Sequence, residues 1–438
     1  MSDTLFPLPE ATPGRGDAGS APPRVLRPNR QQLELRPADL EGLLPAEHRA
    51  RVVWQFVEGL DLGPLYAQVQ AVEGHAGRPA IDPAILMALW LYATLEGVGS
   101  ARAVARLCEE HDAYRWICGG VAVNYHTLAD FRVATGEVLD ELLSTSVAAL
   151  MAEGLVDLQR VAHDGVKVRA SAGAGSFRQG ARLEELVAEA TAQVEALKQE
   201  VHDDPGASAR RLAAARQRVA RERQQRVAQA LAQLPAVVAR RRKAGVKGPA
   251  RVSTTDPDAR RMKMADGGVR PAFNGQITTA TGSQVIVGVA ITNAGTDLGQ
   301  LQPMVEQLQR RYGDGPAEVL ADGGYVALRD IRALAGVGCQ VYAPPKAPRG
   351  RGRAWDWRRR NDEATTAWRT RMATAAAQTI YKERAATSEC VNALARNRGL
   401  QQFAVRGLRK VQAVLLWFAL AHNLLRAVAL RQAAVTVR

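Results

Sequence analysis

The sequence predicts an α/β domain with a mixed sheet flanked by helices, preceded by an all-α region and interrupted by a helical hairpin. From about residue 155 onward, short apolar runs alternate with amphipathic stretches of helical period. Residues 31–154 carry helix-start signals, and residues 181–247 carry a coiled-coil pattern. We therefore expect a tail at 1–30, a helical domain at 31–154 and an α/β domain at 155–438 that contains the hairpin.

Length, charge and cysteine content limit the number of domains and the kinds of partner that we expect. With 438 residues the chain exceeds one ordinary core, so two or three domains are expected. The net charge of +14 favours a polyanionic partner, although an arginine-rich composition from a GC-rich genome would give the same excess. The four cysteines form no CxxC pair, which argues against a zinc site and a disulfide scaffold and indicates a reducing cytoplasm.

Neither end of the chain predicts a membrane segment. Residues 1–30 are rich in Pro, Gly and Ala without hydrophobic period, so we expect a disordered tail and no signal peptide. The most apolar stretch, 411–430, contains His422, Asn423 and Arg426, which a membrane span would avoid. We expect that stretch to be a buried core helix.

The helical region contains a unit that resembles a DNA-binding motif. Asp82 before Pro83 predicts one helix start, and Ser100 and Thr127 are candidate caps of two more helices. Two short helices, a turn and a third helix that carries Arg132 predict a helix-turn-helix-like unit. Three-helix units without a DNA function are also common, so both interpretations stay open.

The first element of the α/β domain is a strand that carries Asp164. Lys167 and Arg169 alternate with two valines after Asp164, which places both cations on one side of the strand. Asp322 follows a second short apolar run and precedes two glycines. We expect both aspartates at the carboxyl ends of strands, where α/β sheets bind ligands.

The insertion at 181–247 predicts two antiparallel helices. A 4-3-4-3-4 apolar spacing starts at Leu183, and a turn at 203–206 leads to a second helix at 207–234, which Pro235 should weaken. The hairpin is either a structural insertion with a solvated basic face or an arm that touches DNA or a partner subunit.

The rest of the domain predicts an RNase H-like order of elements. Strands at 271–281 and 283–293, a helix at 298–313, a strand at 317–322, a helix at 328–338 and a strand at 339–345 precede a helix at 380–398. Glu389 and Arg396 lie two turns apart on this last helix and share a face. Taken alone, the helix could be a solvated charged surface.

Three acids in this arrangement suit two-metal phosphoryl transfer, because Mg²⁺ prefers oxygen ligands. The motif HDGVKVRAS at Asp164, the motif ADGGY at Asp322 and the pattern Tyr381-x2-Arg384-x4-Glu389-x6-Arg396 resemble the acidic motifs of DDE transposases of bacterial insertion sequences. The resemblance is to the class with a Tyr-Arg-Glu-Lys signature. Residues 82–120 are similar to the N-terminal domain of the same class. Arg396 stands where that class usually has Lys, which keeps the charge but changes the hydrogen-bond geometry.

The resemblance implies an enzyme that cuts at element ends and joins a 3′-hydroxyl to target DNA. It implies two Mg²⁺ ions, replaceable by Mn²⁺, held by Asp164, Asp322 and Glu389. It implies double-stranded DNA (terminal inverted repeats and target) as partner, a homodimer, and a cytoplasmic, nucleoid-associated location without a membrane. The residues expected to contact DNA are Arg132, Lys167, Arg169, Tyr381, Arg384 and Arg396.

Two other functions stay open: an RNase H-like nuclease that cuts without joining, and a non-catalytic DNA-binding relic. Asp256 is either a DNA-proximal or a structural residue. The basic segment 346–371, with Trp355, Trp357 and Trp368, either holds DNA near its cleaved end or packs as a surface loop.

Overall fold

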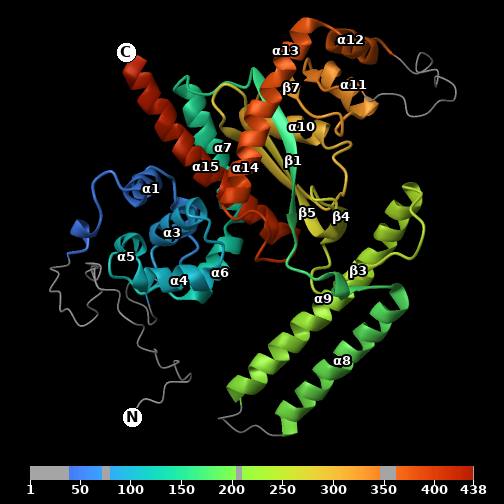
Figure 1. The fold of residues 1–438 in the computed structure, drawn as a ribbon. Coiled ribbons are helices and arrows are strands. Elements are labelled where there is room, and N and C mark those ends of the chain that lie inside the picture. The colour runs from blue at the N-terminus through green and yellow to red at the C-terminus, as the bar shows by residue number, and fades with distance from the viewer. Residues whose placement is uncertain (1–38, 72–78, 204–209, 346–361, 438) are drawn as a thin grey trace, which may run out of the picture. The chain divides into compact units, whose positions relative to one another are not determined.

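The computed structural model describes residues 39–71, 79–203, 210–345 and 362–437 (Figure 1). The chain divides at Asp39, and every element below lies in the unit Leu40–Arg438. The predicted tail at 1–30, the turn at 204–206 and the tryptophans Trp355 and Trp357 lie outside the described residues.

The N-terminal region is helical, as predicted. After a 3₁₀ turn at Glu41–Leu43, its helices are α1 (Arg49–Glu58), α2 (Gly63–Tyr66), α3 (Pro83–Leu95), α4 (Ala101–Glu110), α5 (Asp112–Cys118), α6 (Tyr125–Ala134) and α7 (Gly136–Ala152). The side chains of Asp82 and Ser100 accept backbone N–H groups at the starts of α3 and α4, so both predicted caps are confirmed. The cap predicted at Thr127 is wrong, because Asn124 caps α6 and accepts the N–H of Thr127.

The sheet is mixed and flanked by helices. The strands are β1 (Arg160–Arg169), β4 (Arg260–Lys263), β5 (Val269–Ala280), β6 (Ile286–Thr292), β7 (Glu318–Leu320) and β8 (Gln340–Tyr342), and they lie in the order β4-β5-β1-β7-β8, with β6 also paired to β5. Pairing is parallel between β1, β7 and β8 and antiparallel elsewhere. β5 is central and buried almost throughout, since strands flank it on both edges.

Helices cover the sheet and join it to the N-terminal region. They are α10 (Leu301–Tyr312), α11 (Leu328–Gly336), α12 (Glu363–Met372), α13 (Ala375–Arg384), a π-helical turn (Ala385–Glu389), α14 (Cys390–Asn397) and α15 (Leu408–Val437). α15 packs on β6, α7 and α3, so the helical region and the sheet share one apolar core.

The long helix α15 is the core helix that the sequence predicts. It is long and apolar enough to cross a membrane, but 72% of its most apolar window is buried inside the protein. Asn423 fixes it to the sheet, because its side chain accepts the N–H of Ile286 and donates to the carbonyl of Ile286, both at 2.8 Å. These two bonds satisfy the buried amide of Asn423 and also the backbone N–H and carbonyl of Ile286 at the start of β6.

The insertion forms two long helices side by side, α8 (Gly180–Asp203) and α9 (Arg210–Lys243), next to the short strands β2 (Phe177–Arg178) and β3 (Val252–Ser253) (Figure 1). Leu183, Val227 and Ala230 are buried between them, and the coiled-coil geometry itself stays a prediction. The predicted helix end near Pro235 is wrong. Leu234 and Val237 pack on the same cluster on both sides of the proline, which keeps α9 helical through it.

Candidate active site

Asp164 and Asp322 lie side by side because β1 and β7 pair in parallel. Ala162 is the register partner of Leu320, so each aspartate lies two residues beyond the same rung of the ladder. The expectation that Asp164 ends its strand is wrong. β1 continues to Arg169 because β5 pairs with it along the opposite edge, and Asp164 itself is opposite Ile277.

The third acid, Glu389, lies on a helix that is not regular. The sequence predicts one helix over 380–398, whereas the structure inserts the π turn Ala385–Glu389 between α13 and α14. Residues five apart point about 140° from each other in an α-helix, but i→i+5 bonding places them one above the other. Arg384 and Glu389 therefore share a face, which a regular helix over 380–398 would not allow.

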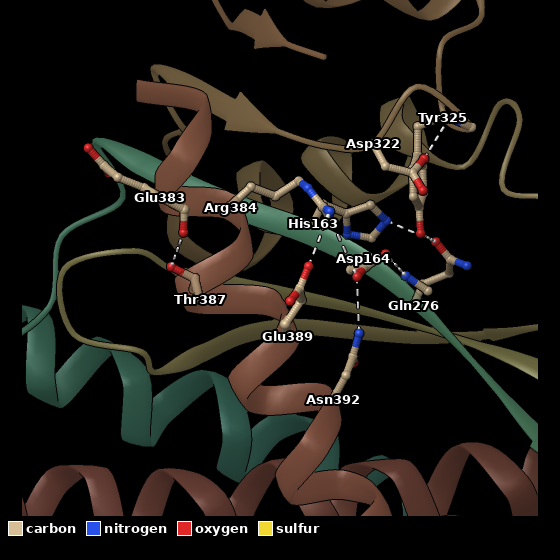
Figure 2. Close-up of polar contacts among 12 residues, drawn as sticks. His163, Asp164, Gln276, Asp322, Tyr325, Glu383, Arg384, Thr387, Glu389 and Asn392 are labelled. Carbon is tan, nitrogen blue, oxygen red and sulfur yellow. Dashed lines mark hydrogen bonds and ion pairs between the residues drawn. The ribbon is translucent and has the colours of Figure 1, made fainter. Parts of the chain in front are cut away.

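Arg384 lies between two of the three acids (Figure 2). Its Nη1 is 3.4 Å from Asp164 Oδ2, and its Nη2 is 3.8 Å from Glu389 Oε1. Burial opposes the charge of Arg384, but Asp164, Tyr381 and Asp322 outweigh burial and raise its pKa. The guanidinium thus acts as the counter-charge of this group of carboxylates.

The side chain of Asp164 is 19% exposed, against 68% for Glu389. Its Oδ1 accepts the N–H of Gly165 at 2.9 Å, and its Oδ2 accepts Nδ2 of Asn392 at 3.1 Å (Figure 2). Burial raises the pKa of Asp164, and the negative charges of Asp322 and Asp297 raise it further, against the lowering effects of the Gly165 N–H and Arg384. A cation held beside Asp164 would favour its ionised form.

A buried polar network supports the strand on the opposite side from Asp164. His163 shares hydrogen bonds with Thr278 Oγ1 (2.8 Å) and Gln276 Oε1 (2.9 Å), and Tyr325 donates its hydroxyl to the same Gln276 oxygen. Burial lowers the pKa of His163 to about 4 and raises the pKa of Tyr325, so both rings are neutral at pH 7. Figure 2 shows the ring of His163 next to Asp164 and the ring of Tyr325 next to Asp322, with Gln276 bonded to both rings.

Gly165 is needed where this network meets β1. A Cβ at this position would lie 2.7 Å from Asp297 Oδ1 and 2.8 Å from the hydroxyl of Tyr325. Asp297 is held by Asn274 Nδ2 (2.6 Å) and Gln276 Nε2 (3.2 Å). The absence of a side chain at Gly165 therefore lets a fourth carboxylate approach the strand beside Asp164.

The aspartates open onto a groove of about 590 Å³, here called the acid groove. Its acidic lining residues are Asp164, Asp322, Asp297 and Asp266. Its basic lining residues are Lys167, Arg169, Lys263, Arg270 and Arg396. A lining of both carboxylates and cations suits a phosphodiester, because the carboxylates can hold metal ions and the cations attract the phosphates.

The structure brings together most of the residues expected to contact DNA. Lys167, Arg169 and Arg396 line the acid groove. Tyr381 lies beside Arg384, whose guanidinium carbon is 5.9 Å from the ring centroid. These contacts leave the DNA-binding role of all five residues a prediction.

Arg132 does not fit its expected role. Its side chain is 8% exposed, donates to the carbonyl of Gly99 and lies over the ring of Trp90 at 4.5 Å. Burial lowers the pKa of Arg132 to about 10. Its backbone carbonyl also accepts Nε1 of Trp417 at 3.0 Å. Arg132 therefore joins α6 to α3 and α15, and its guanidinium is not presented to DNA.

Two further residues have structural roles. Trp368 on α12 is 1% exposed, so it packs in the core and offers no face to a base. Asp256 is fully buried and accepts the N–H of Gly407 at the start of α15. The structure thus favours the structural alternative for both.

The sequence analysis misses Asn392 and Asp297. Asn392 lies three residues after Glu389 on the same helix, a spacing that could have identified it. Asp297 follows β6 in a loop without helical or strand period, so only the fold places it near Asp164.

The donor set fits a hard divalent cation, since carboxylate oxygens are the ligands that Mg²⁺ prefers. Among the described residues, no three His, Cys, Asp or Glu side chains are gathered as a ready metal site. Arg384 lies where a cation would neutralise Asp164 and Glu389. The carboxylates are therefore chemically suitable ligands for Mg²⁺, but in this structure their negative charge is balanced by the guanidinium of Arg384.

Two family models match the chain. One, described as a transposase domain, matches residues 38–134, and the other, described as a transposase DDE domain, matches residues 339–428. The first match covers the helical region through α6, and the second contains Arg384, Glu389 and Asn392. Neither a curated protein nor a solved structure gives a significant match.

Proposed function

The chain belongs to the DDE transposases of the insertion-sequence type, and from this premise we propose that it cuts DNA at element ends and joins the freed 3′-hydroxyl to target DNA. DNA is the substrate that both matched domains imply. The observation that supports the proposal is the acid groove, where Asp164 and Asp322 lie among cations. Beside the groove, Arg384 joins Asp164 to Glu389.

The fold that we propose for this site is RNase H-like. The sheet has long antiparallel strands on one side of β1 and short parallel strands on the other, with helices around it. The predicted strands and helices occur in this order, with β4 and α12 in addition, and Asp164 in β1 lies near Asp322, which follows the neighbouring strand β7. We propose residues 155–438 as the catalytic domain, with 181–247 as its insertion.

Asp164, Asp322 and Glu389 would hold Mg²⁺, two ions in our proposal, with Mn²⁺ as a substitute. When bound, the ions stabilise negative charge on the attacking and leaving oxygens of the phosphodiester.

The remaining residues of the site position the phosphates and the acids. Lys167, Arg169 and Arg396 would hold backbone phosphates along the groove by charge-assisted hydrogen bonds. Asn392 donates to Asp164 and fixes its orientation. Arg384 offsets the repulsion between Asp164 and its acidic neighbours, and Tyr381 lies against its guanidinium.

The test uses Asp164→Asn, Asp322→Asn and Glu389→Gln in the full chain on DNA that carries the element ends. We expect each variant to lose roughly 10³-fold in cleavage rate, the scale for loss of one electrostatic stabiliser, and to keep DNA binding. Asp266→Asn is the matched control, because Asp266 also lines the groove but is exposed and paired with Arg270. Near wild-type cleavage by any triad variant would remove that residue from the site.

A pre-cleaved end separates the proposal from its rivals. Wild type should join a 3′-hydroxyl end to a second duplex in Mg²⁺, whereas a nuclease would cut only intact DNA. A relic would bind DNA and do neither. If wild type cleaves DNA normally but forms no joining products, the nuclease is favoured.

We also propose that residues 31–154 recognise the terminal repeat, that a homodimer pairs the two ends, and that the protein acts in the cytoplasm at the nucleoid. The match of residues 38–134 to a transposase domain supports a role of this region in transposition. Equal affinity of the full chain for terminal-repeat and random duplexes would contradict sequence recognition. The mass of the DNA complex tests the dimer.

A further inference from the structure

A second hollow, of about 450 Å³, lies where the hairpin joins the sheet, and we call it the hairpin pocket. It is bounded by the end of α9, the segment that follows α9, and β4. Its basic lining residues are Arg240, Arg241, Lys247, Arg251, Arg260 and Arg261. None of the described residues that line it is an Asp or a Glu. Six cations around one hollow without a carboxylate repel one another unless an anion is bound.

Three of these cations have internal partners that shape the pocket. Arg241 donates to the carbonyls of Lys247 (2.8 Å) and Gly248 (3.3 Å), which folds the segment after α9 back onto the helix. Arg260 donates to Gln233 Oε1 at 2.6 Å, and Arg240 to Asn293 Oδ1 at 3.1 Å. These partners are carbonyl oxygens, so they leave the positive charges unneutralised.

The other three cations, Lys247, Arg251 and Arg261, are exposed. Within the described residues, Lys247, Arg251 and Arg261 make no hydrogen bond or ion pair through their side chains. The buried Nε atoms of Arg241 and Arg260 also lack a partner there. Burial lowers the pKa of Arg260, and the positive charge of Arg240 lowers it further, against the raising effects of Asp258 and Asp256.

The neighbouring carboxylates are occupied elsewhere. Asp258 accepts the side chain of Gln233 at 2.5 Å and the N–H of Leu408 at 3.0 Å. Asp256 accepts the N–H of Gly407 at 3.2 Å. Both acids therefore hold the start of α15 and form no ion pair with a cation of the pocket, although their charges raise the pKa of Arg260 against the effect of burial.

The strand β4 connects the hairpin pocket to the acid groove. Arg261 lines the pocket, and Lys263, two residues later on the same exposed face of β4, lines the groove. Two residues of a strand span about 7 Å, which equals the rise of about two base pairs along the axis of a DNA duplex. A backbone that lies in the groove can therefore continue into the pocket.

We propose that the hairpin pocket binds backbone phosphate of the same DNA whose scissile phosphate lies in the acid groove. The proposal rests on the proposed function, since it takes DNA as the substrate. Arginine forks suit phosphate oxygens, and unneutralised cations release counterions when they bind a polyanion. The hairpin then serves as a clamp for flanking DNA, with no role in the chemical step.

The test compares two double variants of the full chain that lose the same charge. Arg251→Gln with Arg261→Gln removes two uncommitted cations of the pocket. Arg218→Gln with Arg221→Gln is the control, because both residues are exposed on α9 and line neither the pocket nor the groove. Thermal unfolding of both proteins checks that the fold is kept.

The readout is the dependence of duplex affinity on salt. The slope of log affinity against log salt should fall by about 1.8 in the pocket variant, from about 0.9 for each phosphate contact, and stay at the wild-type value in the control. The difference should vanish on duplexes shortened until they fill only the groove. An unchanged slope in the pocket variant, or an equal fall in the control, would overturn the proposal.

Further measurements distinguish DNA from other ligands of the pocket and test the proposed function separately. Tight binding of inorganic phosphate by wild type at constant ionic strength, together with an unchanged slope for DNA in the pocket variant, would assign the pocket to a free anion. Binding of an acidic protein segment by wild type but not by the pocket variant, together with an unchanged slope for DNA in that variant, would assign the pocket to a protein and overturn the DNA proposal. Failure of wild type to bind any duplex would contradict the proposed function itself.

Discussion

The acid groove and the hairpin pocket are both lined by cations, but the two hollows differ in how those charges are balanced. In the groove, arginines lie among four aspartates, and the nearby Arg384 is 3.4 Å from Asp164. In the pocket, Lys247, Arg251 and Arg261 lie without a carboxylate among the described lining residues. The difference teaches that the number of cations alone does not distinguish a catalytic site from a DNA-binding site. The two kinds of site are distinguished by whether the cations are paired with carboxylates. A paired guanidinium orients the acids, whereas an unpaired one attracts phosphate.

The strongest test of the groove side of this comparison is steric. Gly165→Ala would put a Cβ within 2.8 Å of Asp297 Oδ1 and the Tyr325 hydroxyl, so β1 or its support must shift. We expect cleavage to fall about 10²-fold, the effect of a misplacement near 1 Å, and the free energy of unfolding to fall by about 1–3 kcal/mol. Gly173→Ala is the control, since nothing lies within 4 Å of its Cβ position. Normal cleavage by Gly165→Ala would show that the approach of Asp297 is dispensable.

Removing the internal counter-charge should have the next largest effect. Arg384→Ala leaves Asp164 beside Asp322 and Asp297 without its partner. We expect the rate of end joining to fall about 10- to 100-fold, from about 1.5–3 kcal/mol for a hydrogen bond to a charged group. Lys382→Ala, exposed on the same helix, should stay near wild type. Equal rates for the two variants in joining assays on pre-cleaved DNA would sink the assigned role of Arg384.

Arg396 is the residue of the groove that most resembles those of the pocket, because it is exposed and lines the hollow. Arg396→Ala should weaken binding of the cleaved end about tenfold, the scale of one charge-assisted contact. Arg396→Lys should be milder, since one phosphate contact tolerates a point charge. Joining by Arg396→Ala at the wild-type rate at low DNA concentration would limit the function of this helix to Glu389 and Arg384.

The smallest expected effect is on stability and comes from His163. Its folded pKa of about 4 lies below the usual value of about 6.5, so the unfolded state binds a proton first as the pH falls. Stability from this residue is therefore complete above pH 6.5 and is lost as the pH falls toward 4, with a loss of about 2 kcal/mol between pH 7 and 5.

Urea unfolding at pH 7 and pH 5 measures this loss. His163→Gln should lack that part of the pH dependence, and His126→Gln, a substitution of an exposed histidine, should keep it. Identical pH dependence in His163→Gln and wild type would show that the buried network does not hold His163 neutral.

The sequence by itself determined the features that depend on local chemistry. Apolar period and flanking polar residues located β5, β6, α10 and α15, and Asp82 and Ser100 capped their helices as expected. The motif around Glu389 lies in a short contiguous run inside the region that matches the transposase DDE domain, whereas the roles of Asp164 and Asp322 stay predictions. The assignment of Thr127 as a cap failed, since Asn124 three residues earlier competes for the same role.

Only the tertiary structure decided how these parts meet. Asp164 lies within β1 because β5, more than 100 residues later, pairs with it. Arg132 is a basic residue on an expected DNA-binding helix and Trp368 is an aromatic residue in a basic segment, yet packing buries both. The π turn that rotates Arg384 onto Glu389 breaks the period on which sequence analysis relies. Period and motif are properties of neighbours in the chain. The pairing of charges depends on residues such as 164, 322, 384 and 389 that come together only when the sheet and its helices pack.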